Sequence, residues 1–128
     1  MRTSAGRDFQ SRVMGDSAST GTGLYASARF MAVTENATAP ADGDTALTGE
    51  LTAGGFIRAA AAFAHTTGAT TFTHSLTFTS SDAAARTIQK VAMFNAATVG
   101  TMVFSTAVPS PPTLISGDAL TVTSTVSL

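Results

Sequence analysis

The last nine residues of the chain alternate almost without error between apolar and hydroxyl side chains. Four apolar residues share one face, interrupted only by Ser124, and the other face carries only Thr and Ser. The apolar residues are Leu120, Val122, Val126 and Leu128. Because successive side chains of a strand point to opposite faces, this period predicts a strand with one buried face. The opposite face has no charge, although charged side chains commonly discourage edge-to-edge pairing of soluble domains. The segment therefore favours assembly over chemistry.

A second segment, 70–79, has the same period, with Phe72, His74, Leu76 and Phe78 on one face and Thr or Ser on the other. Further short strands are predicted between turn-rich stretches, at 25–34, 45–51, 56–65, 87–94 and 101–107. Such spacing is typical of an all-β fold. We therefore expect a single β-sandwich, or a barrel, of about seven short antiparallel strands with a short N-terminal helix or arm.

The segment 56–65 is the ambiguous one, because its run of alanines favours a helix. It is only about ten residues long, follows Gly54 and Gly55, and lies between strand-like segments. We therefore predict a strand here.

Composition limits the classes of function. Only 12% of the 128 residues are charged, against ~25% in an ordinary globular domain, and the net charge is −1. The seven Lys and Arg residues are scattered, whereas a nucleic-acid-binding protein clusters cations against phosphates. The absence of Cys excludes disulfides, thiolate metal sites and a Cys nucleophile. No stretch approaches the ~18 apolar residues that span a bilayer, and the start lacks the apolar segment of a secretory leader. We expect synthesis in the cytosol, no membrane partner and no specific nucleic acid.

The N-terminal residues 1–23 differ from the body, 24–128. Phe9, Val13 and Met14 would lie on one side of a short helix running roughly from 5 to 14, and a flexible Gly- and Ser-rich stretch follows. We predict an arm whose three apolar side chains anchor it on a neighbouring chain. The alternative is a first helix that covers the core of its own domain.

No catalytic residue, cofactor or metal site is predicted. His74 lies on the apolar face of its strand, where a packing role is favoured over a titrating one, and His65 is expected at the surface. Neither has the spacing of a metal site. Residues 42–44, Asp-Gly-Asp, read as a turn, since they lack the alternating ligands and terminal Glu of an EF-hand. No serine lies in a Gly-x-Ser-x-Gly motif. We therefore expect a protein that is not an enzyme.

The shared parity within each strand predicts one hydrophobic core. Its expected members are Phe30, Phe72, Leu76, Phe78, Phe94, Phe104, Leu120, Val122 and Val126.

Several stretches of the chain share one family pattern: 5–8, 30–51, 54–61, 64–69, 91–97, 100–104 and 116–123. Through these stretches most of the chain resembles a small family of virion structural proteins of tailed bacteriophages. Members of that family are labelled virion structural, capsid decoration or tail-associated proteins. The resemblance implies a part of a phage particle, and it transfers no functional residue.

From the resemblance and the composition we expect a capsid decoration (cement) protein that stabilises the head. The alternative is a tail or head–tail junction subunit, such as a tube, collar or fibre base. A more remote alternative is a carbohydrate- or receptor-binding β-sandwich, which the absence of Trp and the single Tyr disfavour. The expected partners are copies of the chain and other virion proteins such as the major capsid protein. The expected location is the virion, after synthesis in the cytoplasm of the host bacterium.

Overall fold

The computed structural model describes Met14 and residues 27–128. Apart from Met14, the helix expected over 5–14 and the stretch that follows it to residue 23 lie outside the described residues. Phe9 and Val13 are among those not described.

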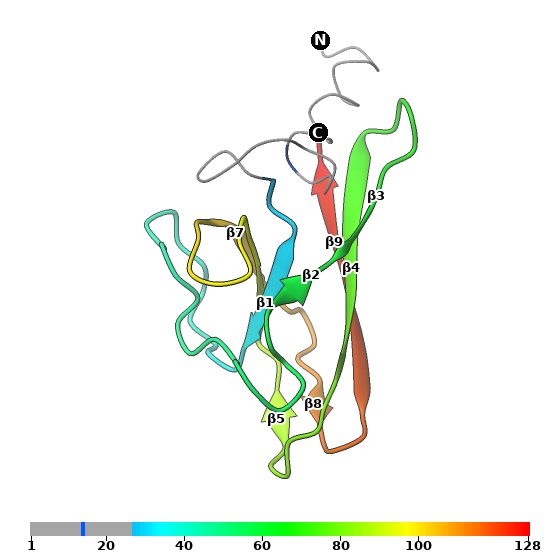
Figure 1. The fold of residues 1–128 in the computed structure, drawn as a ribbon. Coiled ribbons are helices and arrows are strands. Elements are labelled where there is room, and N and C mark those ends of the chain that lie inside the picture. The colour runs from blue at the N-terminus through cyan, green and yellow to red at the C-terminus, as the bar shows by residue number, and fades with distance from the viewer. Residues whose placement is uncertain (1–13, 15–26) are drawn as a thin grey trace.

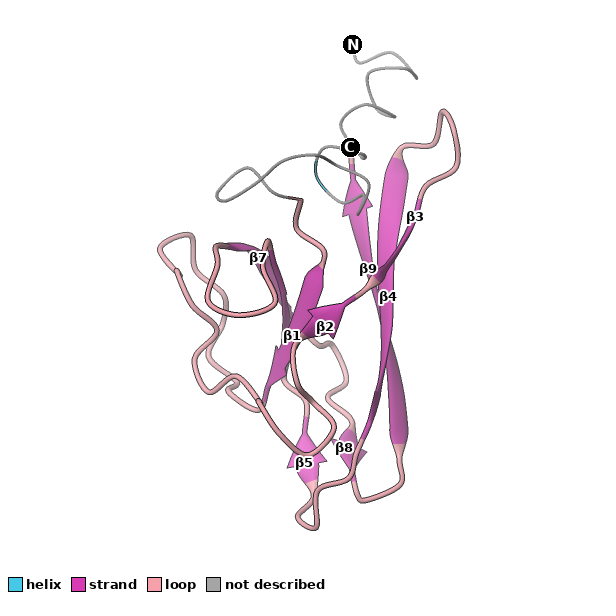
Figure 2. Cartoon of the chain, in the orientation of Figure 1, coloured by secondary structure: helices cyan, strands magenta, loops and turns pink. Residues whose placement is uncertain are grey.

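The described residues form nine strands and confirm the all-β prediction (Figure 1). They are β1 (Phe30–Thr34), β2 (Ala59–Ala60), β3 (Ala62–Ala64), β4 (Thr71–Thr79), β5 (Arg86–Thr87), β6 (Lys90–Phe94), β7 (Met102–Ala107), β8 (Thr113–Leu114) and β9 (Ala119–Ser127). All pair antiparallel, in a four-stranded sheet β2-β1-β6-β7, a three-stranded sheet β3-β4-β9 and a two-stranded sheet β5-β8. Figure 2 shows β4 and β9 as two long, paired strands beside the four-stranded sheet. The arrangement is that of a β-sandwich.

The strand expected over 56–65 is divided between the two larger sheets. Ala60 pairs with Phe30 in the first sheet, and Ala62 pairs with Ser75 in the second. Ala61 lies between them, buried in the core, and its N–H donates to the carbonyl of Arg29. The small side chain of Ala61 lets the chain cross from one layer to the other inside the sandwich.

The main core fills the space between the two larger sheets. Its buried members are Ala28, Met31, Val33, Phe56, Ala61, Phe78, Ile88, Val91, Met93 and Leu114. Of the predicted core, Phe78 is buried here, and Leu76, Phe104, Leu120 and Val122 pack against this cluster as partly buried residues. Val126 is only half-buried.

A second cluster covers the opposite face of the four-stranded sheet, where Leu47 packs on Ala32, Ala92 and Phe94. Phe30 and Met102 are partly buried against it. The central strands β1 and β6 are therefore buried on both faces, so Phe30 and Phe94 do not join the single core predicted for them.

Two further expectations need correction. Residues 45–51 form no strand; Glu50 makes one isolated bridge to Thr34 among turns. The strand expected over 87–94 breaks into β5 and β6, because the segment changes partner: the N–H of Ile88 donates to the carbonyl of Pro112, next to β8, and the N–H of Gln89 donates to that of Thr34 in β1. No helix in the described part of the chain is long and apolar enough to cross a membrane.

Candidate interaction surface

The outward face of the three-stranded sheet carries only Thr, Ser and Ala, and we call it the hydroxyl face. It consists of Ala62, Ala64, Thr71, Thr73, Ser75, Thr77, Thr79, Ala119, Thr121, Thr123, Thr125 and Ser127. Two cross-strand hydroxyl pairs link β4 to β9: Ser75 with Thr123 at 3.0 Å, and Thr77 with Thr121 at 2.8 Å. Such Thr–Thr and Ser–Thr pairs stabilise a sheet without any charge.

Charge is segregated along the chain. Residues 59–81 and 119–128, which contain β3, β4 and β9, include no Asp, Glu, Lys or Arg. The charged side chains of the described residues all lie elsewhere, chiefly around the four-stranded sheet and its loops. One layer of the sandwich is therefore free of the charges that usually keep soluble surfaces apart.

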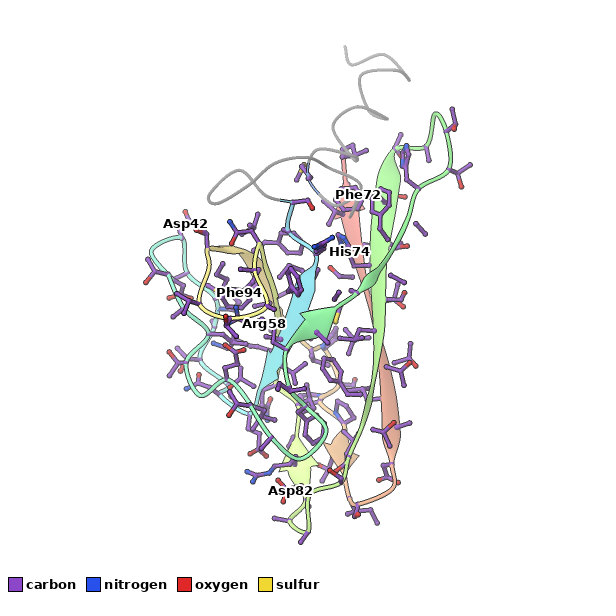
Figure 3. The ribbon with its side chains drawn as sticks, viewed as in Figure 1. Asp42, Arg58, Phe72, His74, Asp82 and Phe94 are labelled. Atoms are coloured by element: carbon purple, nitrogen blue, oxygen red, sulfur yellow. The ribbon has the colours of Figure 1, made fainter. Side chains whose placement is uncertain are left out.

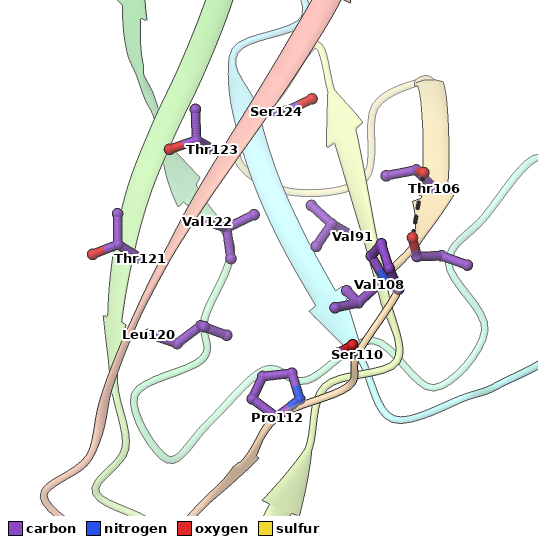
Figure 4. Close-up of a pocket in the computed structure, with 12 residues that line it drawn as sticks. Val91, Thr106, Val108, Ser110, Pro112, Leu120, Thr121, Val122, Thr123 and Ser124 are labelled. Atoms are coloured by element: carbon purple, nitrogen blue, oxygen red, sulfur yellow. Dashed lines mark hydrogen bonds between the residues drawn. The ribbon is translucent and has the colours of Figure 1, made fainter.

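An apolar groove lies beside β9, where the two layers are open to solvent (Figure 4). It has a volume of about 400 Å³ and lies between β9 and the chain that leaves β7, with Val91, Val108, Leu120 and Val122 among its lining residues. Leu120 and Val122 are only partly buried, because the groove leaves one side of each uncovered.

Arg58 fastens the loop before β2 to the loop between β6 and β7, and Figure 3 shows it close to Phe94. Its guanidinium donates two bonds to Glu50, of 2.9 and 2.6 Å, and two more to the carbonyls of Ala96 and Val99, of 3.1 and 2.7 Å. It also lies over the ring of Phe94, 3.5 Å from its centroid. With the Arg58 side chain only 8% exposed, this is a nearly buried, bidentate ion pair that fixes the loops.

A second ion-pair cluster connects β5 to the end of β1. Arg86 contacts Glu35 at 3.0 Å and Asp82 at 2.9 Å. The N–H of Thr87 and the Arg86 guanidinium hold the pKa of Glu35 below its ordinary value. The N–H of Ala84, together with Arg86, lowers the pKa of Asp82, and the two carboxylates raise the pKa of Arg86. These side chains are partly exposed, and their ion pairs tie surface loops together.

The structure describes only one of the three predicted arm anchors. The carbonyl of Met14 accepts the N–H of Ala28 at 2.8 Å, and Met14 is half-buried. Its backbone therefore lies against the start of β1 in its own chain. The contact of the arm with a neighbouring chain remains a prediction.

The histidines behave as packing residues. His74 is fully buried, and its ring contacts the rings of Phe72 and Phe63, with centroids 5.5 and 5.8 Å away. His65 is half-buried, with Nδ1 3.0 Å from the Thr71 carbonyl oxygen. Within the described part of the chain, no group of three His, Cys, Asp or Glu residues could hold a metal ion. The Asp-Gly-Asp segment, 42–44, is an exposed turn.

Two features, the groove and the Arg58–Glu50 ion pair, could not be predicted from the sequence. The groove depends on residues far apart in the chain, and no local period marks it. The Arg58–Glu50 pair is eight residues apart across a glycine turn, and only the low number of charges could have drawn attention to it.

A family model described as "Podophage GP4 fiber I protein gp80" matches residues 12–126, which is most of the chain. The chain belongs to this family. The resemblance to small virion structural proteins of tailed phages is thereby confirmed. No curated protein and no solved structure matches the chain. The gp80 family is named for a fibre, so it fits the tail alternative better than capsid decoration.

Proposed function

We propose that the protein is a non-enzymatic structural subunit of the tail of a phage, in a fibre or at a fibre base. The family match over residues 12–126 carries this proposal. A fibre subunit must hold its shape and bind neighbours repeatedly. The sandwich supplies the shape, with a buried core between two sheets. The charge-free hydroxyl face and the groove are surfaces that can bind another protein without the free-energy cost of desolvating charged side chains.

The partners that fit this role are copies of the chain and neighbouring virion proteins. We also propose that Phe9, Val13 and Met14 contact a neighbouring chain, since each could bury a large apolar side chain there. Deleting residues 1–13 should then reduce incorporation into particles while the purified protein keeps its melting temperature. A collapse in melting temperature would assign these residues to their own domain.

Carbohydrate binding is the weaker alternative. Sugars are usually held by exposed aromatic rings, and the large apolar residues exposed in the described part of the chain are all aliphatic. They are Ile57, Val99, Val103 and Ile115. A structural role therefore accounts for more of this surface than a sugar site does.

The proposed function is tested by locating the protein on the phage particle. Antibodies against the purified protein, labelled with gold, are applied to intact particles and to separated heads and tails. Labelling on tails alone supports a fibre or fibre-base subunit. Labelling distributed over the heads would support the capsid decoration role and contradict the proposal.

A further inference from the structure

The exposed turn at 41–44 contains the one aspartate of the chain that is followed directly by a glycine, Asp42 before Gly43. Residues 37–46 are all exposed, and Figure 3 shows Asp42 at the outer edge of the molecule. A glycine has no side chain to shield its backbone nitrogen, and it lets the chain adopt many conformations. An aspartyl carboxyl group is therefore most easily reached by the nitrogen of the next residue when that residue is glycine.

Neither of these two groups is held by a hydrogen bond within the described part of the chain. The carboxylate of Asp42 accepts no bond there, and the N–H of Gly43 donates none. Each of the other described aspartates has a carboxylate that accepts a backbone N–H. They are Asp44, Asp82 and Asp118. The carboxyl group of Asp42 is therefore free to approach the nitrogen of Gly43, whereas the other three are fixed by their bonds.

A second turn, at 115–118, has the same closing bonds and provides a natural comparison. In both turns the third residue is glycine and the fourth is an aspartate. The N–H of that aspartate donates to the carbonyl of the first residue at 3.0 Å, and its carboxylate accepts the N–H of the first residue at 2.9 Å. The second turn has Ser116 in the place of Asp42, and the N–H of Gly117 donates to the carbonyl of Ser80 at 2.8 Å. Of the two turns, the one at 41–44 therefore has both the carboxyl group and an unbonded nitrogen.

We propose that the Asp42–Gly43 link is a site of spontaneous modification, at which the aspartate is converted through a cyclic succinimide into isoaspartate. The nitrogen of Gly43 forms a bond to Cγ of Asp42, and its proton leaves with one carboxyl oxygen as water. A water molecule then opens the ring. Addition at Cγ restores aspartate, whereas addition at the main-chain carbonyl carbon leaves the chain running through Cγ, which is isoaspartate. The water lost in the first step is regained in the second, so the conversion needs no other reactant.

The side chain of Asp44 controls the rate of this conversion. Closing a five-membered ring requires rotation about the Cα–C bond of Asp42, and the two bonds between Asp44 and Ala41 oppose that rotation. An exposed turn with few bonds opens at a small cost in free energy. The reaction therefore proceeds from the open turn, and its rate depends on how often the bonds of Asp44 break.

Conversion changes the surface beside β7. Isoaspartate adds one methylene group to the main chain, ~1.5 Å in length, between the two residues whose bonds close the turn. The turn forms one wall of a hollow of about 310 Å³, and residues 102–105 of β7 form the opposite wall. Leu47, farther along the same loop, is buried on the four-stranded sheet and should stay in place. Because a virion protein is not replaced after assembly, the altered form should accumulate as particles age.

The test is to keep purified full-length protein at neutral pH for several weeks and to analyse its peptides by mass spectrometry. Fragmentation by electron transfer distinguishes isoaspartate from aspartate at a given residue. We expect a succinimide form that is lighter by one water, and isoaspartate that accumulates at residue 42. Asp44, Asp82 and Asp118 serve as controls in the same sample and should stay unconverted, since their carboxylates are bonded.

Two substitutions within the turn should change the rate in opposite directions. Gly43→Ala should slow conversion about tenfold, because a methyl group beside the nitrogen hinders its attack. The fold should tolerate this change, since the φ of Gly43 is not positive and nothing lies within 4 Å of its Cβ position. Asp44→Ala removes the side-chain bond to Ala41 and should speed conversion roughly 2- to 10-fold, as expected for the loss of one hydrogen bond.

The second turn supplies a matched control. Ser116→Asp creates an Asp-Gly pair in the turn at 115–118, where Ser116 is exposed and the closing bonds are the same. Because the N–H of Gly117 is bonded to Ser80, isoaspartate should form at residue 116 about tenfold more slowly than at residue 42. The melting temperature of each variant shows that its sandwich remains folded.

The proposal would be overturned if no isoaspartate accumulated at residue 42, or if all four described aspartates were converted at similar rates. A Gly43→Ala protein that was converted as fast as wild type would also contradict it. Equal rates at residue 42 and in Ser116→Asp would show that the unbonded nitrogen of Gly43 has no influence. Since every measurement uses purified protein, a failure here is distinguishable from a failure of the location proposed in the tail.

Discussion

Gly55 shows how a single residue holds a turn against the sheet. Its φ is +88°, and a Cβ there would collide with the carbonyl oxygen of Thr79 at the end of β4. Gly117 has a similar φ, +94°, but nothing lies within 4 Å of its Cβ position. Gly117→Ala should therefore cost only the left-handed conformation, about 1–2 kcal/mol. Gly55→Ala should cost roughly 3–5 kcal/mol in urea unfolding, because the backbone must also move. Equal costs would mean that the turn does not pack as described.

Substitution of Ser80 should have the opposite effect on stability. It is 2% exposed, and its Oγ has no hydrogen-bond partner among the described residues, while its backbone bonds to Asp118 and Gly117. Ser80→Ala keeps those backbone bonds and removes a buried, unpaired hydroxyl, so stability should stay unchanged or rise by up to ~1 kcal/mol. Thr34→Val is the control, because the Thr34 hydroxyl bonds the carbonyls of Thr48 and Gly49, and its loss should cost about 1–3 kcal/mol. A destabilised Ser80→Ala would reveal a partner of that hydroxyl.

Arg58 acts between elements, since it joins the loop before β2 to the loop between β6 and β7. Arg58→Lys keeps the charge but cannot keep the two bonds to Glu50, the two carbonyl bonds and the stacking on Phe94. We expect a loss of roughly 2–4 kcal/mol. Arg29→Lys, whose guanidinium lies farther from its ring, at 5.1 Å from Phe30, should cost less. Thermal melting of the two variants makes the comparison, and a larger loss for Arg29→Lys would contradict it.

The Arg86 cluster predicts a response to acid. A carboxylate whose pKa is lowered by folding stabilises the protein above its unfolded pKa, and this stabilisation is lost as the pH falls through the folded pKa. Stability should therefore fall below about pH 4.5, the ordinary pKa of Glu35. Glu35→Gln should make the fall shallower without removing it, since the pKa of Asp82 is lowered as well. Asp42→Asn controls for the loss of one negative charge. An unchanged slope in Glu35→Gln would contradict the account.

The strands differ in how well the sequence predicts them. β4 and β9 were predicted within a residue or two, because each has one buried face and its period is undisturbed. β1 and β6 are predicted as strands, but the odd–even pattern of their side chains assigns Phe30 and Phe94 to the wrong face. Both faces of these strands are covered, and Phe30 and Phe94 pack in the cluster of Leu47 instead of the main core. β8 is two residues long after three prolines and leaves no period to read. Of the surface, the hydroxyl face was foreseeable, whereas the groove required the tertiary fold.

At the scale of the whole molecule, the two larger sheets differ in charge and in how their edges are covered. The four-stranded sheet and its loops hold the ion pairs, which fix the loops around Glu50 and Glu35. The strands of the three-stranded sheet carry no charged side chain, and among the described residues no strand covers the outer edge of β9. A protein that acted alone would gain nothing from leaving such an edge open, and would risk aggregation. A subunit with neighbours in a virion would use it.

The most direct test of the account is a reconstruction of the phage particle by electron cryomicroscopy, with the structure of residues 27–128 fitted into its density. The account predicts a fit in the tail, in fibre or fibre-base density, at the low copy number of a tail structure. Copies distributed over the capsid lattice, with tail density that accepts none, would contradict it.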